Sequence, residues 1–367
     1  MIVFTDNVIS GQMGPLHIMI AIITTFYHNN LSGINQHSDC SFVKMTIHPI
    51  DDKTLDQAAA CLKSGGLVAF PTETVYGLGA LATNATAVAR IFSAKQRPKF
   101  NPLISHFHSV EAALAAGLHS EASAKLAAAF WPGPLTLILN RPDNSPIASL
   151  ASAGTDTLAV RVPSHPVARE LLARVNAPVV APSANPSGRI SPSTARHVAA
   201  GLGSACDMIL DGGACESGIE STVIDCRTDI PVLLRPGPLT TEEIINRTGI
   251  DLGVHSPQKQ PDKPVAPGQI ESHYAPEATV RLNATDKQKD EVYIGFGPAG
   301  PDLIPDFNLS EAADLVEAAA NLFAVLHDAD TLGTRTIAIA PIPMAGLGIA
   351  INDRISRAAA PRPDPAE

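Results

Sequence analysis

The chain has 367 residues, of which 45% are apolar and 17% charged, and its formal net charge is −10. This length suggests about two domains, and the apolar share excludes a chain that is disordered throughout. The acidic balance argues against a protein that coats nucleic acid with a broad basic surface. The five cysteines contain no C-x-x-C pair, so neither a zinc finger nor a disulfide framework is expected. We expect the cysteines to be reduced thiols.

The first 44 residues stand apart from the rest of the pattern. An apolar run at residues 14–26 is too short to span a bilayer comfortably. It also lacks the preceding basic residue and the following cleavage pattern of a secretory signal. We therefore expect residues 1–44 to be a poorly ordered extension of a cytoplasmic protein without a membrane anchor. An over-long start assignment is a second interpretation, because Met45 stands just before the first patterned helix.

From residue 51 onward, helical and strand patterns alternate. Asp51 or Asp52 is expected to cap a helix that runs to Ser64, and Thr83 to cap a second helix that ends near Lys95. The remaining helices are expected at 120–130, 166–175, 193–200 and 240–247, and the strands at 67–70, 135–139, 158–162, 179–181, 208–210, 222–225 and 232–234. This alternation predicts an α/β domain with helices packed on a mainly internal sheet.

The composition changes at residues 256–269, which contain four prolines and no hydrophobic period. Such a segment is typical of a stiff, extended linker and marks a domain boundary. Beyond it, strands are expected at 279–282, 292–296 and 336–340, and helices at 311–327 and 349–360, which together form a small second α/β unit. The predicted parts are an extension (1–44), a first domain (45–255), a linker (256–276), a second domain (277–360) and a tail (361–367).

Several common catalytic motifs are missing from the chain. There is no phosphate-binding G-x-x-x-x-G-K-[ST] loop, no G-x-G-x-x-G that opens a helix after a strand, no H-E-x-x-H and no G-x-S-x-G. His106 and His108 could form a metal-binding pair, but no acidic or cysteine partner lies nearby at ligand spacing. On this pattern alone, loop histidines are the favoured interpretation.

What remains is a set of polar segments at the ends of apolar runs. They lie at 71–79, 95–106, 157–161, 181–188, 218–222 and 233–237. Open α/β sheets bind ligands beyond their strand ends, so these segments are expected to converge. Arg161 and Arg235 each adjoin a strongly apolar strand and therefore need an anionic or carbonyl partner. With Lys95 and Arg97, they indicate an enzyme that binds a polyphosphate or a carboxylate.

Seven of these motifs, in this order, resemble the threonylcarbamoyl-AMP synthase family, also called YrdC-like proteins. They are PTETVYGLG, K-x-R at Lys95 and Arg97, RPKFNPLISH, WPGPLT, S-x-N at Ser183 and Asn185, GIEST, and LLRPG. The resemblance covers residues 50–250. The HYAP that ends the linker and the tail at 346–359 resemble the longer members. The resemblance implies a twisted mixed sheet with helices on its faces, plus a smaller C-terminal Rossmann-like α/β domain.

The resemblance also implies an activity and partners. Members of the family condense L-threonine, bicarbonate and ATP into threonylcarbamoyl-adenylate and release pyrophosphate. A separate tRNA threonylcarbamoyl-transferase complex then modifies the adenosine next to the anticodon, so any contact of this chain with tRNA is expected to be weak or indirect. Mg²⁺ is expected as a cofactor on the ATP phosphates, with no metal ligand from protein side chains.

The site residues implied by the resemblance fall into three groups. The catalytic group comprises Lys95, Arg97, Ser183 and Asn185. The ATP-binding group comprises Arg97, Asn101, Thr157, Ala181, Ser183, Ser191, Arg235 and Tyr274. The threonine-binding group comprises Thr74, His106, Arg161 and Ser221. Arg161 would hold the threonine carboxylate in a bidentate fork, while Lys95 and Asn185 would face the phosphates.

This chain departs from the family pattern in its linker, and three alternatives remain open. The family's linker carries Met and basic residues where this chain has Gln269 to Ser272, so closure of the linker over ATP is expected through Tyr274. A nucleic-acid-binding module is one rival, and the acidic balance counts against it. A hydrogenase maturation factor is another, but its acylphosphatase-like and cysteine-rich segments do not appear. The C-terminal domain could serve as a lid, a dimer surface or a docking site.

Overall fold

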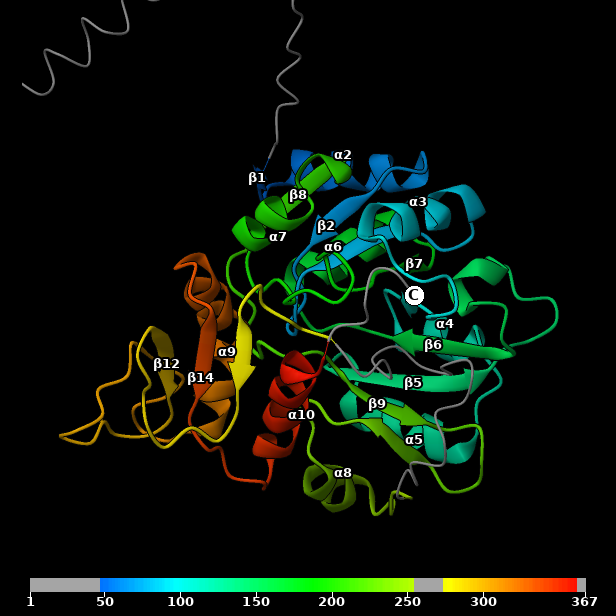
Figure 1. Ribbon diagram of the computed structural model, residues 1–367. Coiled ribbons are helices and arrows are strands. Elements are labelled where there is room, and N and C mark those ends of the chain that lie inside the picture. Colours follow the sequence, from blue (N-terminus) through cyan, green and yellow to red (C-terminus); the bar gives the residue numbers. More distant parts are fainter. Residues whose placement is uncertain (1–46, 254–272, 362–367) are drawn as a thin grey trace, which may run out of the picture. The chain divides into compact units, whose positions relative to one another are not determined.

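The computed structural model describes residues 47–253 and 273–361, which lie within one compact unit, Met45–Glu367 (Figure 1). The expected extension at 1–44, most of the linker and the tail from residue 362 lie outside the described residues. Within the described ranges, no helix combines the length and the apolar character needed to cross a bilayer.

The first of two sheets is large and mixed. Its ten strands are β1 (Ile47–Pro49), β2 (Val68–Phe70), β3 (Gly77–Leu81), β4 (Ile104–His106), β5 (Leu135–Asn140), β6 (Thr157–Arg161), β7 (Val179–Val180), β8 (Met208–Asp211), β9 (Thr222–Asp225) and β10 (Val232–Arg235). They lie in the order β1-β8-β2-β3-β7-β4-β6-β5-β9-β10. The sheet contains both parallel pairs, such as β4 with β6, and antiparallel pairs, such as β5 with β6, which confirms the expected mixed sheet.

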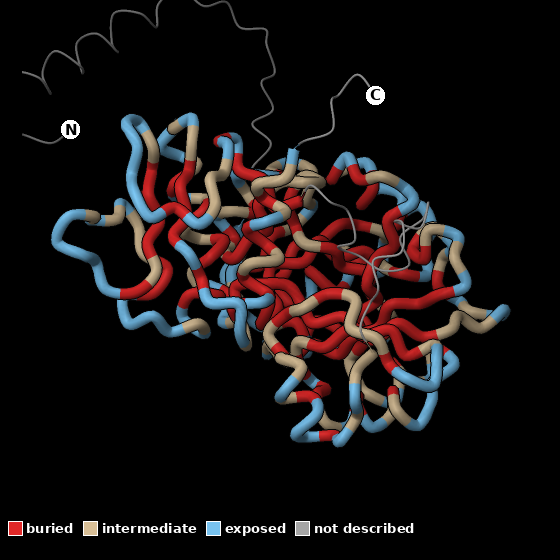
Figure 2. Tube along the Cα trace, turned by 60° about the horizontal axis from the view of Figure 1, so that its bottom comes forward, coloured by how far each residue is buried: buried red, intermediate tan, exposed pale blue. Residues whose placement is uncertain are grey.

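Helices cover both faces of this sheet. They are α2 (Asp52–Lys63), α3 (Ala85–Lys95), α4 (Val110–Ala115), α5 (Glu121–Phe130), α6 (Pro166–Val175), α7 (Ala195–Gly201) and α8 (Thr241–Thr248), with short 3-10 turns at Ser149–Ser152 and Gly203–Ala205. The alternation of side chains along β2 separates the two cores, because Ala69 packs with α3, α5 and α7 while Val68 and Phe70 pack with α2 and α6. Strands β2, β4, β6, β7 and β9 are accordingly buried along their whole length, whereas β1 at the edge of the sheet is partly exposed. Buried residues fill the interior of the chain trace in Figure 2.

Local chemistry sets the helix boundaries, and it corrects two expectations. Asn84, and not Thr83, caps α3, because its side chain accepts a hydrogen bond from the backbone N–H of Ala87 at 3.1 Å. In the second domain, the helix expected at 311–327 runs from Leu315 to Thr331, because Asp314 accepts from the N–H groups of the first turn. In both cases the helix begins after the residue whose side chain accepts from the first-turn N–H groups.

The loop expected at 71–79 is also corrected, because its last three residues belong to β3. Glycines are poor strand formers, and the sequence pattern therefore favoured a loop. Close packing explains their presence in a strand. A Cβ atom on Gly79 would lie 2.8 Å from a ring carbon of Phe70, so a larger residue would clash with the neighbouring strand. The short strands β1 and β4 and helix α4 were likewise missing from the expected elements.

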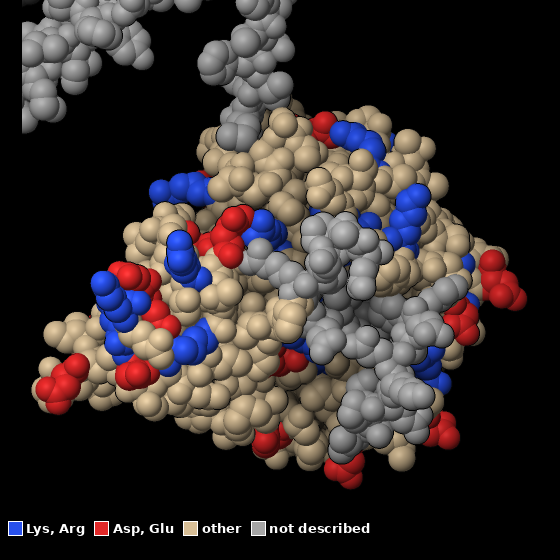
Figure 3. Space-filling view, in the orientation of Figure 1, with Lys and Arg blue, Asp and Glu red and all other residues tan. Residues whose placement is uncertain are grey.

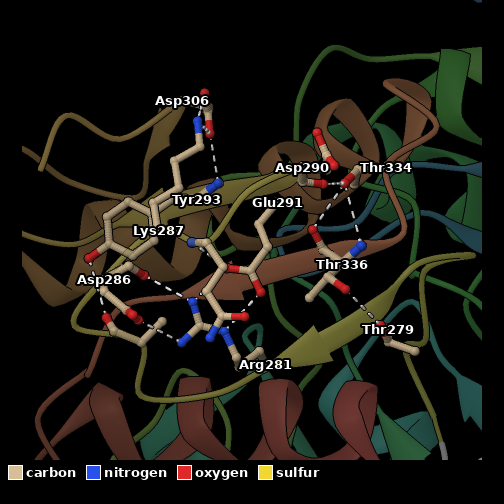
Figure 4. Close-up of polar contacts among 12 residues, drawn as sticks. Thr279, Arg281, Asp286, Lys287, Asp290, Glu291, Tyr293, Asp306, Thr334 and Thr336 are labelled. Atoms are coloured by element: carbon tan, nitrogen blue, oxygen red, sulfur yellow. Dashed lines mark hydrogen bonds and ion pairs between the residues drawn. The ribbon is translucent and has the colours of Figure 1, made fainter.

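The second sheet is smaller and parallel. Its strands are β11 (Thr279–Arg281), β12 (Glu291–Gly295), β13 (Phe307–Asn308) and β14 (Thr336–Ile339), in the order β11-β14-β12-β13, with helices α9 (Leu315–Thr331) and α10 (Leu347–Ala359). This arrangement confirms the expected Rossmann-like unit. Polar groups at one end of the sheet pair within the unit, since Arg281 contacts Asp286 and Glu291, and Lys287 contacts Asp306 (Figure 4).

The hydrophobic core of the second unit extends into the first. Val75, Ile190 and Ile219 pack in the same buried cluster as Leu322 and Phe323 of α9. The approach is close at Gly218, where a Cβ atom would lie 2.4 Å from the carbonyl oxygen of Ala319. The apolar contact therefore joins the segment before β9 to the C-terminal helices.

On the face drawn in Figure 3, basic and acidic side chains of the described residues are interspersed.

Candidate active site

A cavity lies where β4, β6 and β10 end and β9 begins, as expected for an α/β sheet. The residues that line it are Thr74, Val75, Arg97, Pro102, Leu103, Ile104, His106, Arg161, Ala181, Pro182, Ser183, Glu220, Ser221, Arg235, His273 and Tyr274. Its volume, counted out to the open mouth, is about 520 Å³. Of the residues that the structure describes, three arginines and a single carboxylate face this space, so it suits an anion.

Arg161, the last residue of β6, has the anionic partner that its position requires. Its Nη2 lies 2.8 Å from Oε1 of Glu73 and donates to the hydroxyl of Thr74 at 2.9 Å. Both charged side chains are nearly fully buried, and Glu73 is not among the lining residues. The carboxylate thus holds the guanidinium from behind, while Arg161 and Thr74 face the cavity. This confirms the expectation that a buried arginine here needs a partner.

Arg97 and Arg235 are held by carbonyl groups. Arg235 donates from Nε and Nη2 to the carbonyl of Ser221, at 3.1 and 2.9 Å. Arg97 donates to the carbonyls of Asn101 and Pro102. Burial, and then repulsion from Arg235, lowers the pKa of Arg97 to about 10, and burial lowers the pKa of Arg235. Both remain cationic at neutral pH, so an anion in the cavity would relieve their unfavourable environment.

Lys95 and Asn185 do not line the cavity. The ammonium of Lys95 donates to the carbonyl of Ser183 at 2.6 Å and to that of Asn185, and burial lowers its pKa well below the usual value. Lys95 therefore ties the end of α3 to the S-x-N segment, and Ser183 lies at the cavity wall. That Lys95 and Asn185 face the phosphates stays a prediction.

Three of the residues expected to bind ATP also lie outside the lining. Asn101 is buried, and its backbone carbonyl accepts from Arg97. Thr157 lies at the first position of β6, the opposite end of that strand from Arg161, and its hydroxyl is 2.8 Å from that of Thr155. Ser191 donates to Glu220 at 2.5 Å. The structure brings Arg97, Ala181, Ser183, Arg235 and Tyr274 together with all four residues expected to bind threonine.

Glu220 joins the cavity to the C-terminal helix. One oxygen of its carboxylate accepts from Ser191, and the other pairs with Nε of Arg354 in α10 at 2.8 Å. Burial alone raises the pKa of Glu220, but Arg354 and Arg235 outweigh it, so the pKa is lowered overall and the group stays ionised. Arg354 is fully buried and also donates to the carbonyls of Glu220 and Pro236.

Tyr274 completes the wall on the side of the linker. Its backbone adopts φ +64°, a conformation that is uncommon outside glycine and costs energy unless the surroundings hold it. Those surroundings include Phe323, whose ring stacks on Tyr274 with centroids 5.4 Å apart, and the guanidinium of Arg354 at 5.4 Å from the Tyr274 ring. The C-terminal helices therefore position the one linker tyrosine that lines the cavity.

Sequence reasoning missed four residues at this site. Glu73, Glu220 and His273 stand in recognised motifs but were given no role. Glu73 belongs to the PTETVYGLG motif at residues 71–79. A signal existed for Arg354, because it sits among Ala350, Ile351, Ile355 and Ala358 on the apolar stripe of α10. A charge at such a position indicates a buried ion pair.

The two cavity histidines predict a pH dependence of stability. Burial, reinforced for His106 by Arg161, lowers the pKa of His106 and of His273 to about 3. Since an unfolded imidazole titrates near 6.5, the unfolded chain binds more protons between about pH 6.5 and pH 3. The free energy of unfolding should therefore fall on acidification, by about 1.4 kcal/mol per pH unit for each histidine.

Urea unfolding at pH 7, 6 and 5 measures this slope. His106→Asn should flatten it, whereas His119→Asn, a change at an exposed position, should not. Equal slopes for His106→Asn and the unaltered chain would contradict the assignment.

Comparison with known proteins agrees with this geometry. The Sua5/YciO/YrdC family model, described as telomere recombination, matches residues 60–237, and the model of the threonylcarbamoyl-AMP synthase C-terminal domain matches residues 239–360. The threonylcarbamoyl-AMP synthase of Pyrococcus abyssi is 40% identical over 328 residues, which cover 84% of this chain and 95% of that protein. The enzyme of the same name from Bacillus subtilis is 38% identical, covering 85% and 94%.

A solved structure is similar over the same extent. The crystal structure of Pyrococcus abyssi Sua5 complexed with L-threonine superimposes with a TM-score of 0.78 at 38% identity, covering 86% of this chain and 97% of that one. Both sheets are thus accounted for, and the fold inferred from the motifs is confirmed. The chain belongs to the threonylcarbamoyl-AMP synthase family, in the form that carries a C-terminal domain after the Sua5/YciO/YrdC domain.

Proposed function

We propose that this chain condenses L-threonine, bicarbonate and ATP into threonylcarbamoyl-AMP and pyrophosphate. The observation that carries the proposal is the convergence of Arg97, Arg161 and Arg235 on one cavity, where Glu220, the only acidic lining residue in the part of the chain that the structure describes, is already paired. Arg161 is paired with Glu73, whereas Arg97 and Arg235 have only carbonyl partners, so the cavity keeps an excess of positive charge. Such an excess suits a triphosphate together with an amino-acid carboxylate. The relatives' names and the threonine complex of the Pyrococcus abyssi protein support the same substrates.

The cavity residues divide by their position into two subsites. Arg161, Thr74 and His106 gather where β4 and β6 end, and there the threonine carboxylate binds Arg161. Arg97 and Arg235 meet the triphosphate, with Ser183 and Tyr274 beside them. The protein supplies position and charge: it aligns the amino group, bicarbonate and the α-phosphate, and it stabilises the charge that develops as pyrophosphate leaves.

Magnesium enters with the nucleotide in this proposal. Among the described residues no group of three or more His, Cys, Asp or Glu side chains is placed to hold a metal ion. Glu220 engages Ser191 and Arg354 with its two oxygens. The lining residues therefore fit a cation that is held mainly by phosphate oxygens and water, which is how Mg²⁺ usually accompanies ATP. Bound in this way, the ion would neutralise charge on the leaving pyrophosphate.

Mass analysis of the products tests the function. Purified protein mixed with ATP, threonine, bicarbonate and Mg²⁺ should form a threonylcarbamoyl-adenylate and one pyrophosphate for each ATP consumed. Omission of threonine or bicarbonate should abolish both products. Formation of ordinary threonyl-adenylate, or pyrophosphate release without bicarbonate, would contradict the proposal. The proposal also places the protein in the cytoplasm, with a tRNA threonylcarbamoyl-transferase complex as the recipient of the product.

A further inference from the structure

A chain of hydrogen bonds runs behind the cavity through the PTETVYGLG motif at residues 71–79. Nη2 of Arg161 donates to the hydroxyl of Thr74 at 2.9 Å, and this hydroxyl lies 2.8 Å from the hydroxyl of Thr72. The hydroxyl of Thr72 in turn donates to the carbonyl of Val75 at 2.6 Å. Thr74 lines the cavity, whereas Thr72 is buried behind it and is absent from the lining.

The chain has one direction. A hydroxyl carries a single hydrogen, and a carbonyl oxygen can only accept, so the hydrogen of Thr72 points to Val75. The hydrogen between the two threonine hydroxyls must then come from Thr74. Two backbone N–H groups, those of Thr74 and Val75, also point at the Thr72 oxygen at 3.2 Å, a longer distance than the 2.8 Å between the two hydroxyls. The oxygen has two lone pairs, so the two N–H groups share one of them and the Thr74 hydroxyl takes the other.

The consequence for Thr74 is that it has nothing left to donate. Its hydrogen is given to Thr72, one lone pair accepts from Arg161, and one lone pair remains for a ligand. That ligand group must be a hydrogen-bond donor. It must also be uncharged, because a cation on this oxygen would lie beside the guanidinium of Arg161 and be repelled. A hydroxyl meets both conditions, and an ammonium group does not.

Arg161 is held equally firmly from the side away from the cavity. Glu73 contacts its Nη2 at 2.8 Å and anchors its own second oxygen on the backbone N–H of Ser164 at 3.2 Å. Thr72 and Glu73 directly precede Thr74 in sequence, so one turn of backbone fixes both the cation and the acceptor. A carboxylate on Arg161 and a hydroxyl on Thr74 therefore define a site for a hydroxy acid.

We propose that Thr72 is a positioning residue that orients the hydroxyl of Thr74 as an acceptor and thereby selects a β-hydroxy amino acid over its isostere without a hydroxyl. The proposal rests on the proposed function and adds its specificity. Because the hydroxyl and the carboxylate of the amino acid are the anchored groups, its amino group stays free to react with bicarbonate. Valine is the discriminating comparison, since it replaces the hydroxyl of threonine with a methyl group.

Thr72→Val tests the proposal, because it keeps the side-chain shape and removes the acceptor. The hydroxyl of Thr74 is then released to rotate. The threonine concentration for half-maximal rate should rise by about 10- to 100-fold while that for ATP changes less than about twofold, and the preference for threonine over valine should fall by at least about tenfold. Thr72→Ser should restore both quantities. Thr248→Val is the matched control, because Thr248 is a buried threonine whose hydroxyl donates to Ile244 within α8.

The outcomes separate this inference from the proposed function. Failure of the unaltered protein to make threonylcarbamoyl-AMP would remove the function itself. If the unaltered protein is active, an unchanged preference for threonine over valine in Thr72→Val would overturn the inference alone, as would a loss of preference in Thr72→Ser. Should Thr72→Val not fold, Thr74→Val decides, because it removes the acceptor itself. Retained preference for threonine in that variant would also overturn the inference.

Discussion

Replacement of Arg354 by methionine is expected to lower the free energy of unfolding by about 3–5 kcal/mol. The change leaves the carboxylate of Glu220 buried without its partner, and it also removes hydrogen bonds to two carbonyls at the cavity. Removal of one partner of a buried ion pair costs more than removal of both, because the remaining charge has lost its compensation. Denaturant unfolding of the full chain measures the effect.

A second substitution separates the buried charge from lost packing. Glu220→Gln combined with Arg354→Met should recover part of the lost stability, since no unpaired charge remains. Arg90→Met is the matched control: this arginine pairs with Asp207 at 2.9 Å and both side chains are exposed, so its loss should cost about 0–1 kcal/mol. Equal losses for Arg90→Met and Arg354→Met would show that the buried pair has no special weight.

Replacement of Arg97 by alanine is expected to reduce turnover by at least about 100-fold, the effect typical of removing one preorganised donor from a site where charge develops. Two carbonyls hold the guanidinium at the cavity wall, so its position is fixed before a ligand binds. The measurement is pyrophosphate release that requires both threonine and bicarbonate.

Lys99→Ala provides the control for that experiment. Lys99 lies two residues further along the same segment, carries the same charge and is exposed. Its loss should leave turnover within about twofold, because an exposed cation outside the cavity is screened by solvent. Turnover close to normal in Arg97→Ala, or a comparable loss in Lys99→Ala, would remove Arg97 from the reaction.

Much of the fold was predictable, and the exceptions share a cause. A longer periodic element such as α6 agrees with its expected range, because a continuous apolar face is enough to define it. The short strand β9 also agrees, because its residues form a single apolar run that is buried in full. The elements that were missed are short, or rich in glycine as β3 is, so their own residues favour a loop. Pairing with β2 and β7 makes β3 a strand, and pairing is a tertiary property.

The site divides in the same way. Motif order predicted which segments converge, and an arginine next to an apolar strand predicted a buried partner for Arg161 and Arg235. The sequence pattern did not predict which groups would be the partners of the buried charges. The partner of Arg161 comes from residue 73, that of Glu220 from residue 354, and Lys95 contacts backbone carbonyls. The sequence carries little information about such pairs, because they join segments that are distant along the chain.

By itself, the sequence determined the fold class, the family and the sign of the charge at the site, because apolar periodicity and residue type are properties of each segment alone. The tertiary structure decided which cations face the cavity, which groups hold each of them, and which hydroxyls lie next to Arg161. The physical reason is that burial and pairing depend on the distance between groups, and only the packed chain sets those distances.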